Sequence, residues 1–335
     1  MPNGGIDTIH MTYNFKDLGG SKVDVIDALY TKTEEWHYDE NGKMKYTNWK
    51  GTCISPEYNR EFNLYVNDDK FTMYGSINKF IKGNNFEGIT QEELNKSITN
   101  LSEVMGCDLM KADVTRLDFA NNYSVENNPK AYYLFMGSSH QFKRLEQEST
   151  ITYKGTRGTS RHKLLYDKGL WARHTNGVIP EEFEGKHILR FENRITGSNQ
   201  INYVINEGKP TQHKTTVKEA ISNNGLHAQW NDWRNQYFAI KKQNNFKYAI
   251  QMNENPTPSE AKDMLLVSQL QANGEDSLTQ YFEYLKQDNV FGKDQTGRQK
   301  LYRFKKDINE KIDKYRITND LIDELDSKIS HQGIV

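Results

Sequence analysis

Several features that would assign this chain to a protein class directly are scarce or absent. Its 335 residues include only two cysteines, Cys53 and Cys107, which lack metal-ligand spacing. Such thiols are typical of reduced core residues in a cytoplasmic protein, not of a disulfide framework or a zinc site. Proline is limited to 7 residues, low-complexity tracts are missing, and 12% of the residues are aromatic. We therefore expect an ordered globular protein.

Long apolar runs are also missing. The sequence begins MPNGGIDTIHM, without a basic start followed by an apolar core, and no run approaches the length needed to span a bilayer. We therefore expect neither secretion nor membrane insertion.

Several sequence motifs of catalysis are absent as well. The sequence has no H-x-H pair of the kind that holds the metal of common rolling-circle nucleases. It also lacks a Walker phosphate loop, a zinc-finger cysteine pattern and a G-x-S-x-G elbow. These absences argue against an ATP-driven helicase within the chain.

Neither sign of charge dominates, because 44 Lys and Arg face 45 Asp and Glu. Any argument for a nucleic-acid partner must therefore depend on where the charges lie. Residues 140–174 form a basic island, with eight Lys or Arg (Lys143, Arg144, Lys154, Arg157, Arg161, Lys163, Lys168, Arg173) against three acids (Glu146, Glu148, Asp167).

Residues 1–210 read mainly as strands. The segments IDTIHMTYNF, KYTNWKGTCIS, REFNLYVN, KFTMYGSINKF, STITYKG, SRHKLLYDKG and KHILRFENRIT show period-2 alternation or short apolar runs. A capping box at Thr90 predicts a helix carrying Leu94, Ile98, Leu101 and Met105 on one face, and Asn128 with Pro129 predicts a second helix. The pattern predicts an α+β fold, with an antiparallel sheet core and helices on one face.

Beyond residue 210 the character becomes helical and strongly charged. After a connecting region at 211–249, capping signals at Thr257 and Ser277 and a charged stretch from Arg298 predict a small helical domain over 250–335. The basic cluster RFKKDINEKIDKYR alternates with acids, so a solvated amphipathic helix and a DNA-binding helix are both consistent with it.

Three predicted strands place ionisable side chains on a shared face. In VTRLDFA, Arg116, Asp118 and Val114 have one parity, with Leu117 and Phe119 on the other. In ILRFENR, Arg190, Glu192 and Arg194 share a face. Asp7 is expected on the face of Ile9, with His10 opposite.

Acids on central strands are costly unless they are paired or bind a cation. Carboxylates at Asp118 and Glu192 suit Mg²⁺ or Mn²⁺, which could polarise a scissile phosphate. The alternative is a structural network in which Arg116, Arg190 and Arg194 pair with the same acids.

Tyr166 and Lys168 end the basic island's SRHKLLYDKG segment and would share one face if both lay on a strand. A tyrosine attacks phosphorus poorly at its ordinary pKa near 10, so a nearby cation would be needed. Lys168, Arg161 or His162 could provide it. The alternative is that Tyr166 is simply one of 19 tyrosines, packed in a sheet.

The order of four segments, IDTIHM, VTRLDFANNYSV, STITYKGTRGTSRHKLLYDKGLWARH and ILRFENRI, resembles the gene II and gene X replication proteins of filamentous phages. It more distantly resembles plasmid initiators of the Rep_trans type. The resemblance covers about residues 5 to 200. It implies a cytoplasmic protein of a bacterial host cell that nicks one DNA strand at an origin of replication, keeps the 5′ end, leaves a 3′-hydroxyl and later rejoins the strand.

The resemblance also implies roles for particular residues. Tyr166 becomes the nucleophile and Lys168 its activator or phosphate partner, with Asp118, Glu192 and, less directly, Asp7 as ligands of Mg²⁺ or Mn²⁺. The DNA-binding residues would be Arg116, Arg157, Arg161, His162 and Lys163. Strand separation would depend on supercoiling and a host helicase, and a host polymerase would extend the 3′-hydroxyl.

Two other interpretations fit the same residues. A non-catalytic protein that binds single-stranded DNA or regulates replication would use the basic island without cutting. A scaffold protein would use Asp118, Glu192 and their arginines only as an ion-pair network, so that mutating either acid would unfold it.

Overall fold

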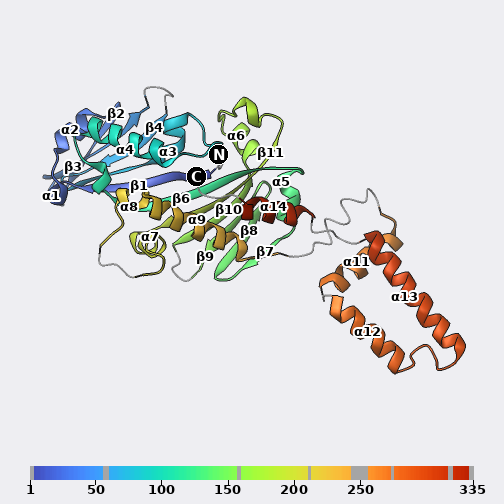
Figure 1. The fold of residues 1–335 in the computed structure, drawn as a ribbon. Helices are drawn as coiled ribbons and strands as arrows, with labels where there is room; N and C mark the ends of the chain where they lie inside the picture. Colours follow the sequence, from blue (N-terminus) through green and yellow to red (C-terminus); the bar gives the residue numbers. More distant parts are fainter. Residues whose placement is uncertain are drawn as a thin grey trace. The chain divides into compact units, whose positions relative to one another are not determined.

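The computed structural model describes residues 4–55, 60–156, 160–209, 213–242, 256–272, 275–315 and 320–331, so Arg157 lies outside the described residues. The chain forms two compact units (Figure 1). The first comprises Met1–Pro129, Ser139–Ile240 and Lys328–Val335, and the second comprises Lys130–Ser138 and Lys241–Ser327.

An antiparallel sheet organises the first unit. Its neighbouring strands follow the order β8, β9, β10, β11, β6, β1, β5, β4, β3, β2. Their bounds are β1 (Gly4–Asn14), β2 (Thr31–Tyr38), β3 (Met44–Ile54), β4 (Glu61–Val66), β5 (Lys70–Ser76), β6 (Asp113–Val125), β8 (Phe142–Gln147), β9 (Thr150–Gly155), β10 (Arg161–Asp167) and β11 (His187–Thr196). The central strands β6 and β11 are therefore flanked by β1 on one side and β10 on the other.

Helices and short helical turns connect these strands. They are α1 (Phe15–Leu18), α2 (Lys22–Asp27), α3 (Ile77–Lys82), α4 (Gln91–Met105), η1 (Leu109–Lys111), α6 (Lys168–His174), η2 (Glu181–Phe183), α7 (Ser198–Ile205), α8 (Val217–Ala220) and α9 (Asn223–Phe238). The predicted capping box at Thr90 is confirmed at the start of α4, and all four predicted apolar residues of that helix are buried.

Alternation along the central strands explains why one face of the sheet is covered by helices. The rings of Phe119 and Phe191 pack against Trp233 of α9, and the indole nitrogen of Trp233 donates to the carbonyl of Phe191 at 3.1 Å. In Figure 1, α7, α8 and α9 lie across this face. The predicted α+β class, with an antiparallel sheet and helices on one face, is confirmed.

Two predicted strands end earlier than the sequence suggested. The KFTMYGSINKF strand stops at Ser76. The side chain of Ser76 accepts a hydrogen bond from the amide of Lys79 and so caps α3. The SRHKLLYDKG strand stops at Asp167, which accepts from the amide of Leu170 and caps α6. Such capping satisfies helix-start donors that would otherwise lack partners.

The second unit is mainly helical. It contains α11 (Pro258–Ala272), α12 (Glu275–Gln287), α13 (Gln295–Tyr315) and most of α14 (Asp320–His331). Three short elements lie where the chain passes from one unit to the other: α5 (Pro129–Tyr133), β7 (Met136–Ser139) and β12 (Ile240–Lys242). A helical C-terminal region is thus confirmed.

Two features of the second unit follow from its sequence. The predicted capping box before α11 is present, because Thr257 and Glu260 exchange hydrogen bonds. Phe282, Leu285 and Ile308 form a small apolar core between α12 and α13. Among the described residues of both units, no helix has the length and apolar character needed to cross a membrane.

Candidate active site

The register of the central strands brings Tyr166 and the predicted metal ligands to the sheet face opposite α9. Tyr166 on β10 pairs with Arg190 on β11, which pairs with Asn122 on β6. Directly paired residues point to the same side of a sheet. Because side chains alternate, Glu192 lies on this face too, one step along β11.

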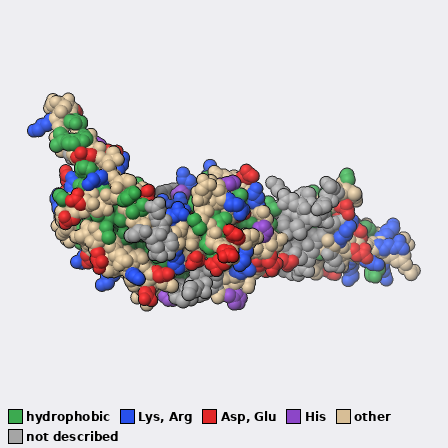
Figure 2. All heavy atoms as spheres, turned by 90° about the horizontal axis from the view of Figure 1, so that it is seen from above, with side chains coloured by type: hydrophobic (Ala, Val, Ile, Leu, Met, Phe, Trp, Pro, Cys, Tyr) green, Lys and Arg blue, Asp and Glu red, His purple; other side chains and the backbone are tan. Residues whose placement is uncertain are grey.

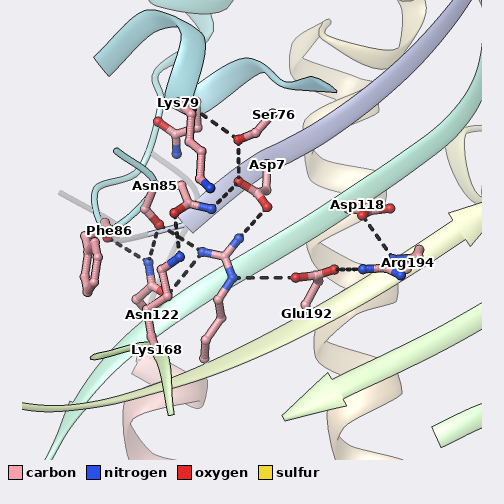
Figure 3. Close-up of polar contacts among 12 residues, drawn as sticks. Asp7, Ser76, Lys79, Asn85, Phe86, Asp118, Asn122, Lys168, Glu192 and Arg194 are labelled. Atoms are coloured by element: carbon pink, nitrogen blue, oxygen red, sulfur yellow. Dashed lines mark hydrogen bonds and ion pairs between the residues drawn. The ribbon is translucent and has the colours of Figure 1, made fainter. Parts of the chain in front are cut away.

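Arg190 is the centre of a polar network whose other members Asp7, Asn85, Asn122 and Glu192 are labelled in Figure 3. Its side chain is 2% exposed and forms a 2.7 Å ion pair with Asp7. One guanidinium nitrogen also donates to the backbone carbonyl of Asn85 at 3.0 Å and to the side-chain oxygen of Asn122 at 3.2 Å. Buried charge is costly without such partners, so the network fixes the guanidinium in one place.

Asp7 reaches this network through a β-bulge. The β1–β6 pairing shifts between Ile6 and Thr8, which places Asp7 on the site face together with Thr8. The prediction that Asp7 shares its face with Ile9 is therefore wrong. Ile9 pairs with the core residue Leu117.

Shifts in the β1–β6 pairing also change the predicted faces of His10 and Val114. His10 pairs with Arg116 on the site face, where the alternation had placed it opposite Asp7. A second shift between His10 and Met11 turns Val114 into the core, against its predicted parity with Arg116.

Three contacts satisfy the carboxylate of Asp7. Besides the ion pair with Arg190, it accepts hydrogen bonds from Ser76 at 3.0 Å and Asn85 at 2.9 Å. Burial raises the pKa of Asp7, but Arg190 and then Lys168 outweigh burial and hold that pKa at about 2. Asp7 is therefore ionised, and its contacts already position Arg190 and Asn85.

Asp118 and Glu192 are joined by Arg194. Its guanidinium donates to Asp118 at 3.1 Å and to Glu192 at 2.9 Å. Arg116 also binds Asp118 through both of its oxygens, at 2.9 and 2.5 Å. The arginine pairing that the sequence left open as a structural alternative is thus present.

The two guanidiniums do not fully offset this pair of carboxylates. Burial, opposed by the hydrogen bonds from Arg116 and reinforced by the charge of Glu192, raises the pKa of Asp118 to about 6. Burial therefore disfavours the ionised form of Asp118, even with two guanidiniums bound to it.

Tyr166 lies at the inner end of the site. Its side chain is 8% exposed, and its hydroxyl donates to Glu192 Oε2 at 3.4 Å. Burial raises the pKa of this phenol well above 10, and the opposing effect of Arg190 is smaller. The phenol is therefore protonated at rest, with Glu192 as the acceptor nearest to its proton.

Lys168 approaches the site from a helix, not from the strand that carries Tyr166. Because α6 begins at Lys168, the predicted shared face with Tyr166 is wrong. Its ammonium is buried, donates to the side-chain oxygen of Asn85 at 2.5 Å and lies over the rings of Phe86 and Trp171. Burial, followed by Arg190, lowers the pKa of Lys168 to about 6.

The predicted DNA-binding residues separate onto two faces. Arg116 and His162 lie on the site face and are half-buried. Arg161 and Lys163 are buried on the helix-covered face. Arg161 pairs with Asp232 at 2.7 Å.

Lys163 donates to Ser139 at 2.8 Å and to the carbonyl of Gln236 at 3.0 Å. Like Arg161, it is therefore engaged inside the protein. Over the face seen in Figure 2, basic and acidic side chains are interspersed, in line with the near-zero net charge.

The three predicted metal ligands do not form one cation site. Asp7 is satisfied by its own partners, whereas Asp118 and Glu192 meet across Arg194. Across the described ranges, no group of three or more His, Cys, Asp or Glu could hold a metal ion. The pair Asp118 and Glu192 nevertheless has the oxygen donors that Mg²⁺ and Mn²⁺ prefer.

Several residues of the site were not predicted from the sequence. Asn85 lies in a loop between α3 and α4, and its carbonyl also accepts from Asn122 at 3.0 Å. Asn122 belongs to the VTRLDFANNY strand and has the parity of Asp118, so alternation alone could have placed it on this face. Asn85 carries no comparable signal, because a loop has no period.

Comparison with protein families gives a match over the part of the chain that carries the site. A family model described as the replication-associated protein G2P, N-terminal, matches residues 6–213, which is more than half of the chain and includes every residue of the site. No curated protein matches the chain.

Proposed function

Since the chain belongs to the G2P replication-associated protein family of the filamentous-phage gene II type, we propose that it starts replication by nicking one strand of DNA, with Tyr166 as the nucleophile. The observation that carries this proposal is the contact between the Tyr166 hydroxyl and Glu192 inside a site built from arginines. A protonated phenol beside a fixed carboxylate is the arrangement that general-base activation of a nucleophile requires.

The reaction is a transesterification. Tyr166 Oη attacks the phosphorus while its proton passes to Glu192 Oε2. The new bond joins Oη to the 5′-phosphate, the bond from phosphorus to the 3′-oxygen breaks, and that oxygen leaves with a proton from water. Reversal of these steps with a new 3′-hydroxyl rejoins the strand, so no ATP is needed.

The arginines provide the positive charge for this step. Side chains of Arg116 and Arg194 are 25% and 32% exposed, so each can reach a phosphate while still contacting Asp118. Fixed cations next to developing negative charge stabilise a transition state without reorganisation. Arg190 is fully engaged inside and acts by holding Glu192 and Asp7 in position.

We also propose that a divalent ion, Mg²⁺ or Mn²⁺, is bound by Asp118 and Glu192. When bound, it would polarise the scissile phosphate. Glu192 can serve both purposes because its two oxygens differ: Oε2 faces Tyr166 and Oε1 faces Arg194. Asp7 takes no part in this ligand set.

Lys168 is proposed as a positioning residue. Its lowered pKa leaves it largely neutral near pH 7, and its hydrogen bond to Asn85 stabilises the loop that also holds Asp7 and Arg190. Lys168 therefore acts on Tyr166 through this network. A host helicase and polymerase would complete replication.

The test uses supercoiled DNA carrying the native origin, Mg²⁺ or Mn²⁺, and denaturing gels that detect both a nick and a protein–DNA adduct. Tyr166→Phe is expected to abolish both products. Tyr153→Phe is the matched control, because Tyr153 is buried on the neighbouring strand but faces the opposite side of the sheet, beside Lys163.

Tyr153 is the tyrosine nearest to Tyr166 in the sequence, but burial raises its pKa to about 12 and its side chain faces away from the site. Nicking by the Tyr166→Phe variant would disprove the assigned nucleophile. Binding of origin DNA without any nick by the unmodified protein would instead support a non-catalytic replication regulator.

A further inference from the structure

We propose that a single strand of DNA crosses the site face of the sheet, the face opposite α9, perpendicular to the β-strands, and that Tyr74 and His10 form a platform on which its bases stack. This inference rests on the proposed function and extends it to a second part of the DNA, beside the scissile phosphate.

Strand pairing places six side chains in two short lines on the sheet, offset by two residues where β6 meets β11. His10 pairs with Tyr74 on β5 and with Arg116 on β6. On the other side, Arg194 of β11 pairs with His162 of β10, which pairs with Lys154 of β9. We call this set the cross-strand row; its members in order are Tyr74, His10, Arg116, Arg194, His162 and Lys154.

Asp118 connects the two halves of the row. It pairs with Arg194 across β6 and β11, and its carboxylate is bound by Arg116 and Arg194. The row therefore passes directly beside Glu192, which Arg194 also contacts. A phosphate held by Arg194 would lie next to the proposed site of attack.

The cross-strand row is accessible to a single strand of DNA. Tyr74 is 39% exposed and Lys154 is exposed, while the four residues between them are half-buried, as expected on a flat sheet surface. Six neighbouring strands span about 24 Å at about 4.8 Å each. Binding surfaces for single strands commonly hold about 4–16 nucleotides.

The chemistry of the row favours an unpaired strand. Arg116, Arg194 and Lys154 can each contact a phosphate, whereas both imidazoles are largely neutral near pH 7. Burial, then Arg116 and Arg194, lowers the pKa of His10 to about 4, and burial followed by Arg194 lowers the pKa of His162. The row contributes three permanent cations, so its binding to DNA needs contacts in addition to those with phosphate.

Aromatic rings supply these contacts at one end of the row. The rings of His10 and Tyr74 are 5.2 Å apart and inclined at 44°, so they do not cover each other face to face. Exposed aromatic rings stack on bases irrespective of sequence, but only when the bases are unpaired. Duplex DNA would offer the same phosphates without free base faces.

The experiment measures binding in the Tyr166→Phe background, which forms no covalent adduct. Fluorescence anisotropy would follow a labelled 20-nucleotide single strand and the matching duplex. Tyr74→Ala is expected to weaken single-strand binding roughly 5- to 150-fold, the loss typical of one base–aromatic stack. Tyr74→Phe keeps the ring and should bind like the parent.

Two further variants complete the design. Tyr203→Ala is the matched control, because Tyr203 is 58% exposed on α7, a helix of the covered face. Lys154→Ala should reduce the slope of log K against log salt concentration by about 0.7, the change for one lost phosphate contact on a single strand.

The outcomes separate this inference from the proposed function. Unchanged binding by Tyr74→Ala, or equal loss with single strand and duplex, overturns the cross-strand row even if Tyr166 nicks DNA. Loss of single-strand binding by Tyr74→Ala, rescue by Tyr74→Phe and no effect of Tyr203→Ala support it even if no nick is ever detected.

Discussion

Replacing Arg190 with methionine is the sharpest test of the buried network. Methionine fills much of the same volume but leaves the carboxylates of Asp7 and Glu192 without their central partner. Removing one member of a buried ion pair typically costs about 3–5 kcal/mol of unfolding free energy.

The pKa of Asp7 gives an independent estimate of this cost. A shift from 3.8 to about 2 corresponds to about 2–3 kcal/mol of stabilisation of the folded state. Because the folded pKa is lowered, this contribution is fully present above pH 3.8 and is lost as the pH falls through about 2. Between pH 4.5 and 7.5, Asp7 of the unmodified protein adds no pH dependence.

Arg190→Met should reverse this behaviour. Burial then acts on Asp7 without its main opposing charge, so the folded pKa of Asp7 should rise above 3.8. The unfolding free energy of the variant should therefore fall as the pH rises from 4.5 to 7.5. Adding Asp7→Asn should restore about 2–3 kcal/mol at pH 7.

Urea denaturation followed by tryptophan fluorescence measures these values. All five tryptophans, at positions 36, 49, 171, 230 and 233, lie in the first unit, so the signal reports on the sheet that carries the site. A loss below about 1 kcal/mol at pH 7, or a double variant no more stable than Arg190→Met, would refute the reasoning.

Three further predictions concern the remaining parts of the site and its support. Glu192→Gln should lower the rate of nicking by about 10²–10⁴-fold, the usual effect of losing a general base, while the variant stays folded at room temperature; loss of the folded state of this variant at room temperature would instead favour a purely structural network. The lowered pKa of Lys168 means that the unfolded chain binds more protons between pH 6 and 10, so the unfolding free energy should rise over this range, and Lys168→Met should remove that part of the rise in urea titrations. Trp233→Ala should cost about 3–5 kcal/mol in the same assay, because its fully buried indole packs on Phe191 and Tyr123 under the sheet; a loss near zero would contradict the packing described here.

Period and capping signals were enough to predict most of the architecture. The alternation in VTRLDFA correctly put Arg116 and Asp118 on one face with Leu117 opposite, because β6 is regular over these residues. The capping box at Thr90 correctly started α4, since that signal is local to four residues.

The errors arose where geometry changes within one or two residues. A bulge beside Asp7 broke the period of β1, and the cap at Asp167 turned Lys168 into the first residue of a helix. Neither change alters the composition of its segment, so a period count could not detect it.

Alternation also cannot say which face of a strand is covered. Arg161, His162 and Lys163 looked equivalent in the basic island, yet α9 buries the first and third and leaves His162 on the site face. The partner that decides this, Asp232, lies about 70 residues further along the chain. Only the fold brings these residues together.

Identification of the tyrosine that carries DNA after nicking tests the central claim most directly. Protein trapped on origin DNA would be digested with nuclease and protease, and the nucleotide-bearing peptide would be sequenced by mass spectrometry. The account predicts that the nucleotide is attached to Tyr166, one of 19 tyrosines in the chain. A nucleotide attached to any other residue would contradict it.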